Sequence, residues 1–286
     1  MKKLLLFSML VMIGLGVQAQ RTSVKPINID LWTNGLPNSN GMEAQGYDDS
    51  KQNYKPSMSV YLPQNVSTPT KAVIVLPGGG YSMLCLDYEG HEWADFFLGN
   101  DIATIVLKYR LPNGHCEVPQ SDVYEAIRLV RAHATEWNIN PNKVGVMGFS
   151  AGGHLTSTVS THWKDRSVRP DFQVLMYPLI SADPEITVLW CYEKLLGKNP
   201  SKEMLDLYSN ELQVKEDTPR AFIALSDDDS AVHSFHSTRY YEALKKHHVS
   251  ATLHIYPTGE HGWGISENFR YHMEMLSDLR AWLRSF

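Results

Sequence analysis

The chain has 286 residues, of which 43% are hydrophobic and 20% charged, and its formal net charge at pH 7 is −5. This composition is ordinary for a globular protein, and α/β folds often exceed about 200 residues as one domain. The acidic balance and the lack of a basic stripe exclude nucleic acid as an expected partner.

The first residues have the pattern of an export signal. Two lysines follow Met1, an apolar stretch begins at Leu4, and a small residue, Ala19, precedes the expected cleavage point. The stretch is short for a membrane span and no other segment qualifies, so we expect no membrane insertion. We therefore predict a signal peptide at residues 1–19 and an exported, periplasmic or extracellular, α/β domain at residues 20–286.

The predicted domain begins with a lead-in segment, residues 20–70. Its first part is polar and irregular, and residues 34–41 are dense in turn-forming residues. Residues 59–63 read Ser-Val-Tyr-Leu-Pro, which predicts an edge strand that stops at the proline.

From Lys71 onward, short apolar runs rich in β-formers alternate with segments of helical periodicity. Such alternation predicts a mostly parallel sheet with helices on both faces. The expected strands are residues 72–76, 102–109, 143–148, 172–179, 220–226 and 251–256, and the expected helices include 123–137 and 269–283.

Residues 181–219 interrupt this alternation and are expected to form a small cap insertion with a short helix near 202–208. The segment contains Trp190 and Tyr192. An aromatic side chain in such a position either shapes a substrate site or closes the core. The sequence favours neither.

The strand at 72–76 leads into Pro-Gly-Gly-Gly-Tyr at residues 77–81. Consecutive glycines let backbone N–H groups approach a ligand closely. At a strand end they match an HGGG-type oxyanion loop, with Pro77 in place of the histidine. We expect the N–H groups of Gly79, Gly80 and Ala151 to stabilise an oxyanion. A phosphate-binding loop and a flexible turn are the alternatives, and the absence of a following Lys-Ser/Thr together with the order of the other motifs disfavours both.

Residues 148–152 read Gly-Phe-Ser-Ala-Gly directly after an apolar strand and before a helical segment. This G-x-S-x-G pattern predicts a nucleophile elbow, a sharp turn that exposes the hydroxyl of Ser150. The turn is so tight that side chains at Gly148 and Gly152 are expected to clash. The helix that follows favours negative charge at its N-terminus.

A serine hydroxyl needs a base, and the order Ser, Asp, His is the one this motif requires. The strand at 220–226 ends in Asp227, Asp228 and Asp229, and the strand at 251–256 opens into a glycine-rich loop with His261. These residues follow strand ends at the same edge of the predicted sheet as Ser150. Three adjacent carboxylates cannot all be buried as charges, so one is expected to orient His261 and the others to be solvated.

Cys85, Cys116 and Cys191 form no cluster with metal-ligand spacing, and packing of buried thiols is the expected role. In an exported protein, a disulfide between two of them is the alternative. We expect no metal and no organic cofactor, because the nucleophile, base and oxyanion donors all come from the chain.

Taken together, the motifs resemble those of the α/β-hydrolase superfamily, and more narrowly the bacterial esterases related to hormone-sensitive lipase that include acetylxylan and feruloyl-esterase-like proteins. The resemblance extends from about residue 29 to the C-terminus and rests on residues 77–81, 109–112, 148–155, 229–232 and 259–263. Within the aspartate triplet, the D-x-x-V pattern of these enzymes selects Asp229, three residues before Val232. The resemblance implies an acyl-enzyme mechanism with Ser150, Asp229 and His261.

What the resemblance implies for function is hydrolysis of short acyl esters, foremost acetyl, on a plant polysaccharide such as xylan. A feruloyl esterase, a prolyl-oligopeptidase-like peptidase and a non-catalytic carbohydrate-binding module are the alternatives. A prolyl-oligopeptidase-like enzyme is expected to have a long N-terminal propeller, which this sequence does not show. A non-catalytic module is expected to have lost a triad member, and none is missing here. Tyr81 follows the oxyanion glycines and Trp263 follows His261, so both are predicted to line the substrate cleft and contact sugar rings.

Overall fold

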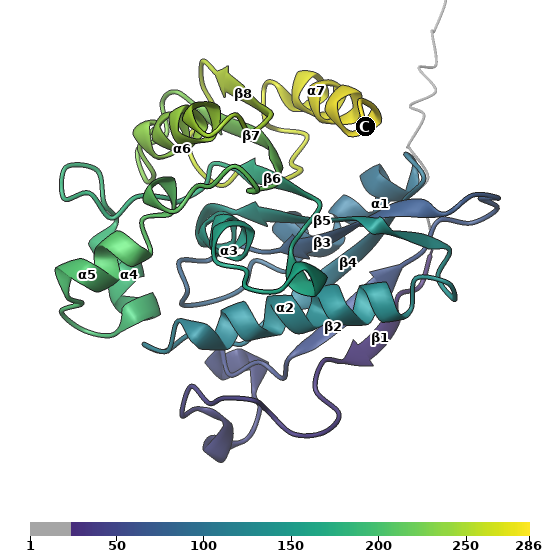
Figure 1. The fold of residues 1–286 in the computed structure, drawn as a ribbon, viewed down its shortest axis with the longest axis horizontal. Coiled ribbons are helices and arrows are strands. Elements are labelled where there is room, and N and C mark those ends of the chain that lie inside the picture. Colours follow the sequence, from purple (N-terminus) through teal and green to yellow (C-terminus); the bar gives the residue numbers. More distant parts are fainter. Residues whose placement is uncertain (1–23) are drawn as a thin grey trace, which may run out of the picture.

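A computed structural model describes residues 24–286, and the predicted signal peptide lies outside these residues. One eight-stranded sheet runs through the molecule in the order β1-β2-β4-β3-β5-β6-β7-β8 (Figure 1). The pairs β1–β2 and β2–β4 are antiparallel, and every following pair in this order is parallel. The strands are β1 (Ile27–Asp30), β2 (Ser57–Tyr61), β3 (Thr70–Leu76), β4 (Ile102–Lys108), β5 (Ile139–Phe149), β6 (Phe172–Met176), β7 (Arg220–Ser226) and β8 (Ala251–Tyr256).

The prediction that residues 59–63 form the edge strand is wrong. Strand β2 lies between β1 and β4, with Val60 paired to both Ile27 and Ile105, so β1 forms that edge. The four-residue β1 was missed because Ile-Asn-Ile-Asp is too short for its alternation to stand out from the polar lead-in.

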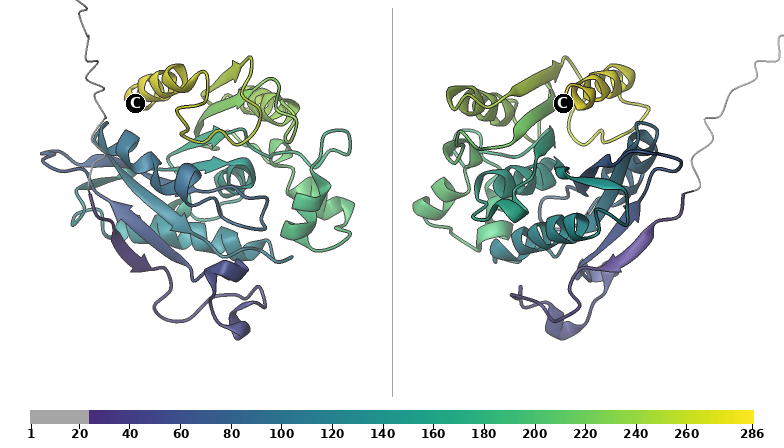
Figure 2. Two further views of the ribbon diagram at one scale, coloured as in Figure 1. Left: turned by 180° about the vertical axis from the view of Figure 1, so that it is seen from behind. Right: turned by 45° about the vertical axis from the view of Figure 1, so that its right-hand side comes forward.

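Helices cover both faces of the sheet, as the alternating pattern predicted (Figures 1 and 2). Alternate residues of β7 show how the faces divide: Ile223 packs in one core cluster with Leu244 of α6, whereas Phe222 packs in another with Leu279 of α7. The first face also carries α2 and α3, and the second also carries α1. The helices of these layers are α1 (Trp93–Leu98), α2 (Glu117–Ala132), α3 (Ser150–Thr161), α6 (Phe235–Lys246) and α7 (His272–Arg284).

The predicted cap insertion contains two short helices, α4 (Leu189–Leu196) and α5 (Lys202–Leu207), which lie together at one side of the ribbon in Figure 1. Tyr192 connects the cap to the core: its side chain is fully buried and its hydroxyl donates to the carbonyl of Ile180. Of the two cap aromatics, Tyr192 therefore packs in the core. Trp190 does not, since its side chain is 55% exposed.

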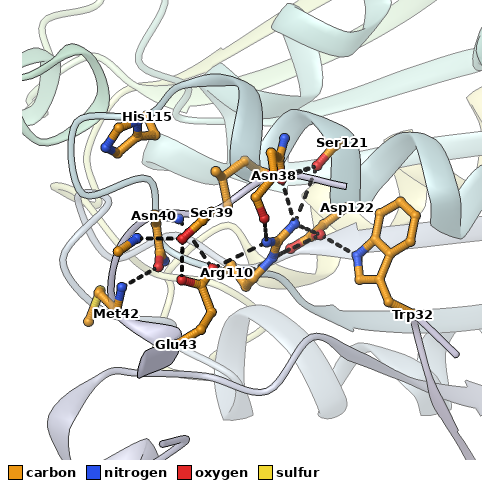
Figure 3. Close-up of polar contacts among 12 residues, drawn as sticks. Trp32, Asn38, Ser39, Asn40, Met42, Glu43, Arg110, His115, Ser121 and Asp122 are labelled. Atoms are coloured by element: carbon orange, nitrogen blue, oxygen red, sulfur yellow. Dashed lines mark hydrogen bonds and ion pairs between the residues drawn. The ribbon is translucent and has the colours of Figure 1, made fainter. Parts of the chain in front are cut away.

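A buried ion pair anchors the lead-in segment to the sheet (Figure 3). Arg110 Nη2 lies 2.7 Å from Asp122 Oδ1, and both side chains are almost completely buried. The same guanidinium donates to the carbonyl of Asn38, and the indole of Trp32 donates to Asp122. Removing one partner of such a pair typically costs about 3–5 kcal/mol, because the other charge stays buried. Arg110 thus has a structural role far along the chain from the serine motif.

Three further findings bear on the sequence predictions. Cys85, Cys116 and Cys191 are all free thiols. No helix within residues 24–286 has the length and apolar character to cross a bilayer. Over the same residues, no group of three potential ligands is arranged to hold a metal ion.

Candidate active site

The turn between β5 and α3 is a nucleophile elbow in its backbone geometry. Ser150 has φ of 51°, a left-handed conformation that costs a non-glycine residue on the order of 1–2 kcal/mol. A Cβ at Gly148 would lie 2.1 Å from the carbonyl oxygen of Gly152, and one at Gly152 would lie 2.2 Å from that of Leu76. Glycine is therefore required on both sides of the serine, as the sequence analysis predicted.

The elbow brings Ser150 against the loop that follows β8. Ser150 Oγ lies 2.8 Å from Nε2 of His261, and the other ring nitrogen, Nδ1, lies 2.7 Å from Oδ2 of Asp229. The three residues are thus joined in one hydrogen-bonded chain although up to 111 positions separate them in the sequence. Each follows the carboxyl end of a parallel strand, which is the edge where sites form in open α/β sheets.

The carboxylate fixes the tautomer of the imidazole. Because ionised Asp229 can only accept, Nδ1 of His261 carries the proton and Nε2 is left to accept the hydroxyl proton of Ser150. The side chain of Asp229 is completely buried, whereas that of His261 is 22% exposed. In the neutral form of its partly open ring, His261 thus presents an acceptor, Nε2, to the serine.

The structure distinguishes the three aspartates clearly. The second oxygen of Asp229 accepts the N–H groups of Ala231 and Val232, at 3.0 and 2.8 Å, which holds the carboxylate in place. The bond to Val232 gives a physical basis for the three-residue step in the sequence. Asp227 and Asp228 are exposed, and Asp228 accepts the N–H of Glu260 instead. Only Asp229 contacts His261 through its side chain among the three.

The glycine loop after β3 lies beside the serine. A Cβ at Gly78 would come within 3.1 Å of Ser150 Cβ, which places the loop directly against the elbow. Gly79 and Gly80 have φ of 125° and 62°, conformations that favour glycine. Ala151 is in the first turn of α3, where N–H groups have no intrahelical acceptor. Its N–H and those of Gly79 and Gly80 are thus the candidate oxyanion donors.

A model of the α/β hydrolase fold family matches residues 73–265, a range that contains the glycine loop, Ser150, Asp229 and His261. The chain belongs to the α/β hydrolase family. Among curated proteins, an acetylxylan esterase of Xylanibacter ruminicola is 42% identical over 235 residues, covering 81% of this chain and 48% of that protein. Endo-1,4-beta-xylanase B of Butyrivibrio fibrisolvens is 31% identical over 78% of this chain and 38% of its own length.

This α/β hydrolase thus spans less than half the length of these two curated relatives. A solved structure matches it over almost its full length: the acetyl ester-xyloside bifunctional hydrolase from Caldicellulosiruptor lactoaceticus. That structure superposes with a TM-score of 0.79 at 34% identity, covering 92% of this chain and 97% of the other. The predicted fold class and the resemblance to carbohydrate esterases are confirmed by these matches.

The prediction that Tyr81 lines the substrate cleft is wrong. Its side chain is only 2% exposed, and its hydroxyl lies 2.8 Å from Nδ1 of His154. Nε2 of His154 contacts the carbonyl of Tyr208, which only accepts, so Nδ1 accepts the tyrosine proton. The left-handed φ of 56° at Tyr81 accompanies this inward placement of the ring, toward α3.

The same prediction for Trp263 is also wrong. This indole is 6% exposed, stacks on Phe269 with ring centroids 4.3 Å apart, and donates its N–H to Ser226 at 3.1 Å. Both its apolar face and its polar group are therefore satisfied inside the protein. Proximity in sequence to the loop residues was a poor guide, because tight turns reverse the direction of a side chain within one or two residues.

Two residues near the site gave weaker signals in the sequence. Trp190 of α4 lies against the glycine loop, where a Cβ added to Gly80 would be 2.2 Å from Cη2 of the indole. Glu89, in a π-helical turn (Asp87–His91), is 2% exposed and accepts the N–H of Gly78. The sequence pattern leaves the role of Trp190 open, and it does not mark Glu89, because one acidic residue among polar neighbours carries no periodic signal.

Proposed function

We propose that this protein is a serine carboxylic-ester hydrolase that removes short acyl groups, foremost acetyl, from xylan or a related plant polysaccharide. The observation that carries the proposal is the continuous chain from Ser150 Oγ through His261 to Asp229, with contacts of 2.8 and 2.7 Å. The serine also lies against a glycine loop suited to oxyanion stabilisation.

In the proposed reaction, Ser150 Oγ attacks the acyl carbon while its proton passes to Nε2 of His261. The carbonyl oxygen becomes an oxyanion that accepts hydrogen bonds from the N–H groups of Gly79, Gly80 and Ala151. His261 then gives its proton to the departing sugar oxygen. A water molecule attacks the acyl-enzyme and its proton goes to His261, which passes it to Ser150 Oγ as the carboxylic acid leaves. Asp229 stabilises the imidazolium of His261 during both acylation and deacylation.

The substrate class is supported by the names of the similar proteins. The relatives include an acetylxylan esterase and a xylanase, and the matching structure is an acetyl ester-xyloside hydrolase. The first name specifies acetyl esters of xylan, the second specifies xylan, and the third specifies acetyl esters and xylosides. A feruloyl esterase remains the second candidate within the same chemistry.

An exposed aromatic surface beside the site further supports a sugar substrate. Trp190 is 55% exposed and lies against Gly80, so a substrate whose ester is held by the glycine loop would bring its neighbouring ring to the indole. Aromatic faces suit the C–H surfaces of sugar rings. Trp190 therefore takes the role that the sequence had suggested for Tyr81 and Trp263.

The deciding experiment measures released acid from acetylated xylan, acetylated pectin and methyl ferulate, with an aminoacyl-nitroanilide as the peptidase substrate. We expect acetate from xylan, and a Ser150→Ala variant at least about 10⁴-fold slower with an unchanged fold. Near wild-type turnover in folded Ser150→Ala contradicts the serine mechanism. Hydrolysis of the nitroanilide alone indicates a peptidase, and a folded protein inert on every substrate indicates a non-catalytic module.

We also propose that the protein is exported to the periplasm or beyond, on the pattern of residues 1–19. Fractionation of the source cells and N-terminal sequencing test this proposal. A mature chain that begins near residue 20 is expected. A cytoplasmic protein that retains Met1 contradicts it.

A further inference from the structure

A buried acid outside the Ser150–His261–Asp229 chain lies at the base of the site. Glu89 is 2% exposed, and both of its oxygens accept hydrogen bonds. It belongs to a π-helical turn (Asp87–His91), a rare element that often occurs at functional sites. Burying a carboxylate is costly unless its interactions repay the lost hydration. The positions of the two donors indicate what those interactions do.

One oxygen of Glu89 holds the glycine loop. Oε2 accepts the N–H of Gly78 at 2.8 Å, so this N–H is already used and the next two glycines are left as oxyanion donors. A Cβ at Gly78 would lie 2.7 Å from Oε2 and 3.1 Å from Ser150 Cβ. The carboxylate and the serine therefore flank the same glycine. By accepting the N–H of Gly78, Glu89 fixes the orientation of the backbone that leads into the donor residues Gly79 and Gly80.

The other oxygen holds the histidine loop through one intermediary. The hydroxyl of Tyr177, directly after β6, donates to Oε1 of Glu89 at 2.8 Å and accepts the N–H of Gly264 at 2.8 Å. The ring of Tyr177 packs edge-on against His261 with centroids 4.9 Å apart. Tyr177 itself has an unusual φ of 36°. One carboxylate thus links the oxyanion loop to the loop that carries the base.

When ionised, Glu89 also acts on the site through its charge. Burial raises the pKa of Glu89, while the hydrogen bonds from Tyr177 and Gly78 and the nearby His261 act in the opposite direction. The attraction is reciprocal: an ionised Glu89 favours the imidazolium form of His261. That form arises when the base takes the proton from Ser150.

We propose that Glu89 is a positioning residue that aligns the oxyanion loop with His261 and stabilises the imidazolium through its buried charge. The proposal rests on the proposed ester hydrolysis by Ser150. It assigns a role in the reaction to a second acid, beyond Asp229, that touches neither substrate nor serine.

The test compares Glu89→Gln and Tyr177→Phe with Asp122→Asn, a matched change at a buried acid that belongs to the Arg110 pair. Hydrolysis of p-nitrophenyl acetate gives kcat, KM and the pH profile of kcat/KM. For Glu89→Gln we expect kcat to fall about 10- to 100-fold with KM within about threefold. The acid limb of the pH profile of kcat/KM should move to lower pH, because His261 loses a nearby negative charge.

Tyr177→Phe removes the hydroxyl link but leaves the carboxylate, so kcat should fall while the acid limb moves much less than in Glu89→Gln. Asp122→Asn should lower the Tm and leave the acid limb in place. A folded Glu89→Gln with wild-type kcat and acid limb overturns the proposal. A lower Tm and lower kcat with an unshifted limb show a merely structural role and overturn it as well. If Glu89→Gln does not fold, an unchanged kcat in Tyr177→Phe overturns it.

A second readout separates this inference from the proposed function. Diethyl p-nitrophenyl phosphate reacts with an activated serine and releases one nitrophenolate, whatever the natural substrate. If wild-type protein hydrolyses no ester but Ser150 is labelled, the proposed function fails, and the pH dependence of labelling in Glu89→Gln still tests the inference. If Ser150 is not labelled either, both fail.

Discussion

Replacing Trp190 by alanine tests the proposed sugar contact most directly. The indole is 55% exposed, which leaves roughly 140 Å² of a side chain of about 250 Å² facing solvent. A sugar ring stacked on one face covers about half of this area. At about 25 cal/mol per Å² the contact contributes about 1.7 kcal/mol, or on the order of 20-fold in kcat/KM. We therefore expect Trp190→Ala to lower kcat/KM on acetylated xylo-oligosaccharide by about this factor, mainly through KM.

The assay measures acetic acid released from acetylated xylo-oligosaccharide and from ethyl acetate, which has no ring to stack. Ethyl acetate should be hydrolysed at nearly the wild-type rate. Trp163→Ala is the matched control, because Trp163 follows the C-terminal end of α3, a helix that begins at Ser150 and extends about 18 Å away from it. Equal losses on both substrates, or no loss on the oligosaccharide, refute the sugar contact.

Three further predictions follow from the site and the core. Asp229→Asn should lower kcat by about 10³–10⁴-fold and Asp227→Asn by no more than a few-fold, because only the former carboxylate contacts His261; the reverse order contradicts the assignment. Among p-nitrophenyl esters, acetate should have a higher kcat/KM than palmitate, because the cap between β6 and β7 offers only short helices to cover a long acyl chain; a maximum on palmitate contradicts this. Burial lowers the pKa of His154 from 6.5 to about 4, so its folded form stays neutral while the unfolded chain takes up a proton as the pH falls. This should remove about 3 kcal/mol from the free energy of unfolding between pH 7 and 4; denaturant titrations test it, and His154→Gln should show a shallower pH dependence.

The sequence determined the fold class and the backbone features of the site. Alternating apolar runs and helical periodicity predicted the parallel sheet, and each of the six strands expected after Lys71 is present with boundaries shifted by up to four residues. The clash of a side chain at Gly148 or Gly152 followed from the spacing of the motif alone. Such features are local, because backbone sterics within a few residues decide them.

The tertiary structure decided where the side chains point and which of them meet. It brought Asp229, rather than its two neighbours, against His261, and it buried Tyr81 and Trp263 while leaving Trp190 exposed beside the glycine loop. Glu89 became visible only when its two hydrogen-bond donors, distant in sequence, were brought to it. Burial and hydrogen bonding depend on neighbours supplied by other strands and helices, so a pattern along one segment cannot specify them.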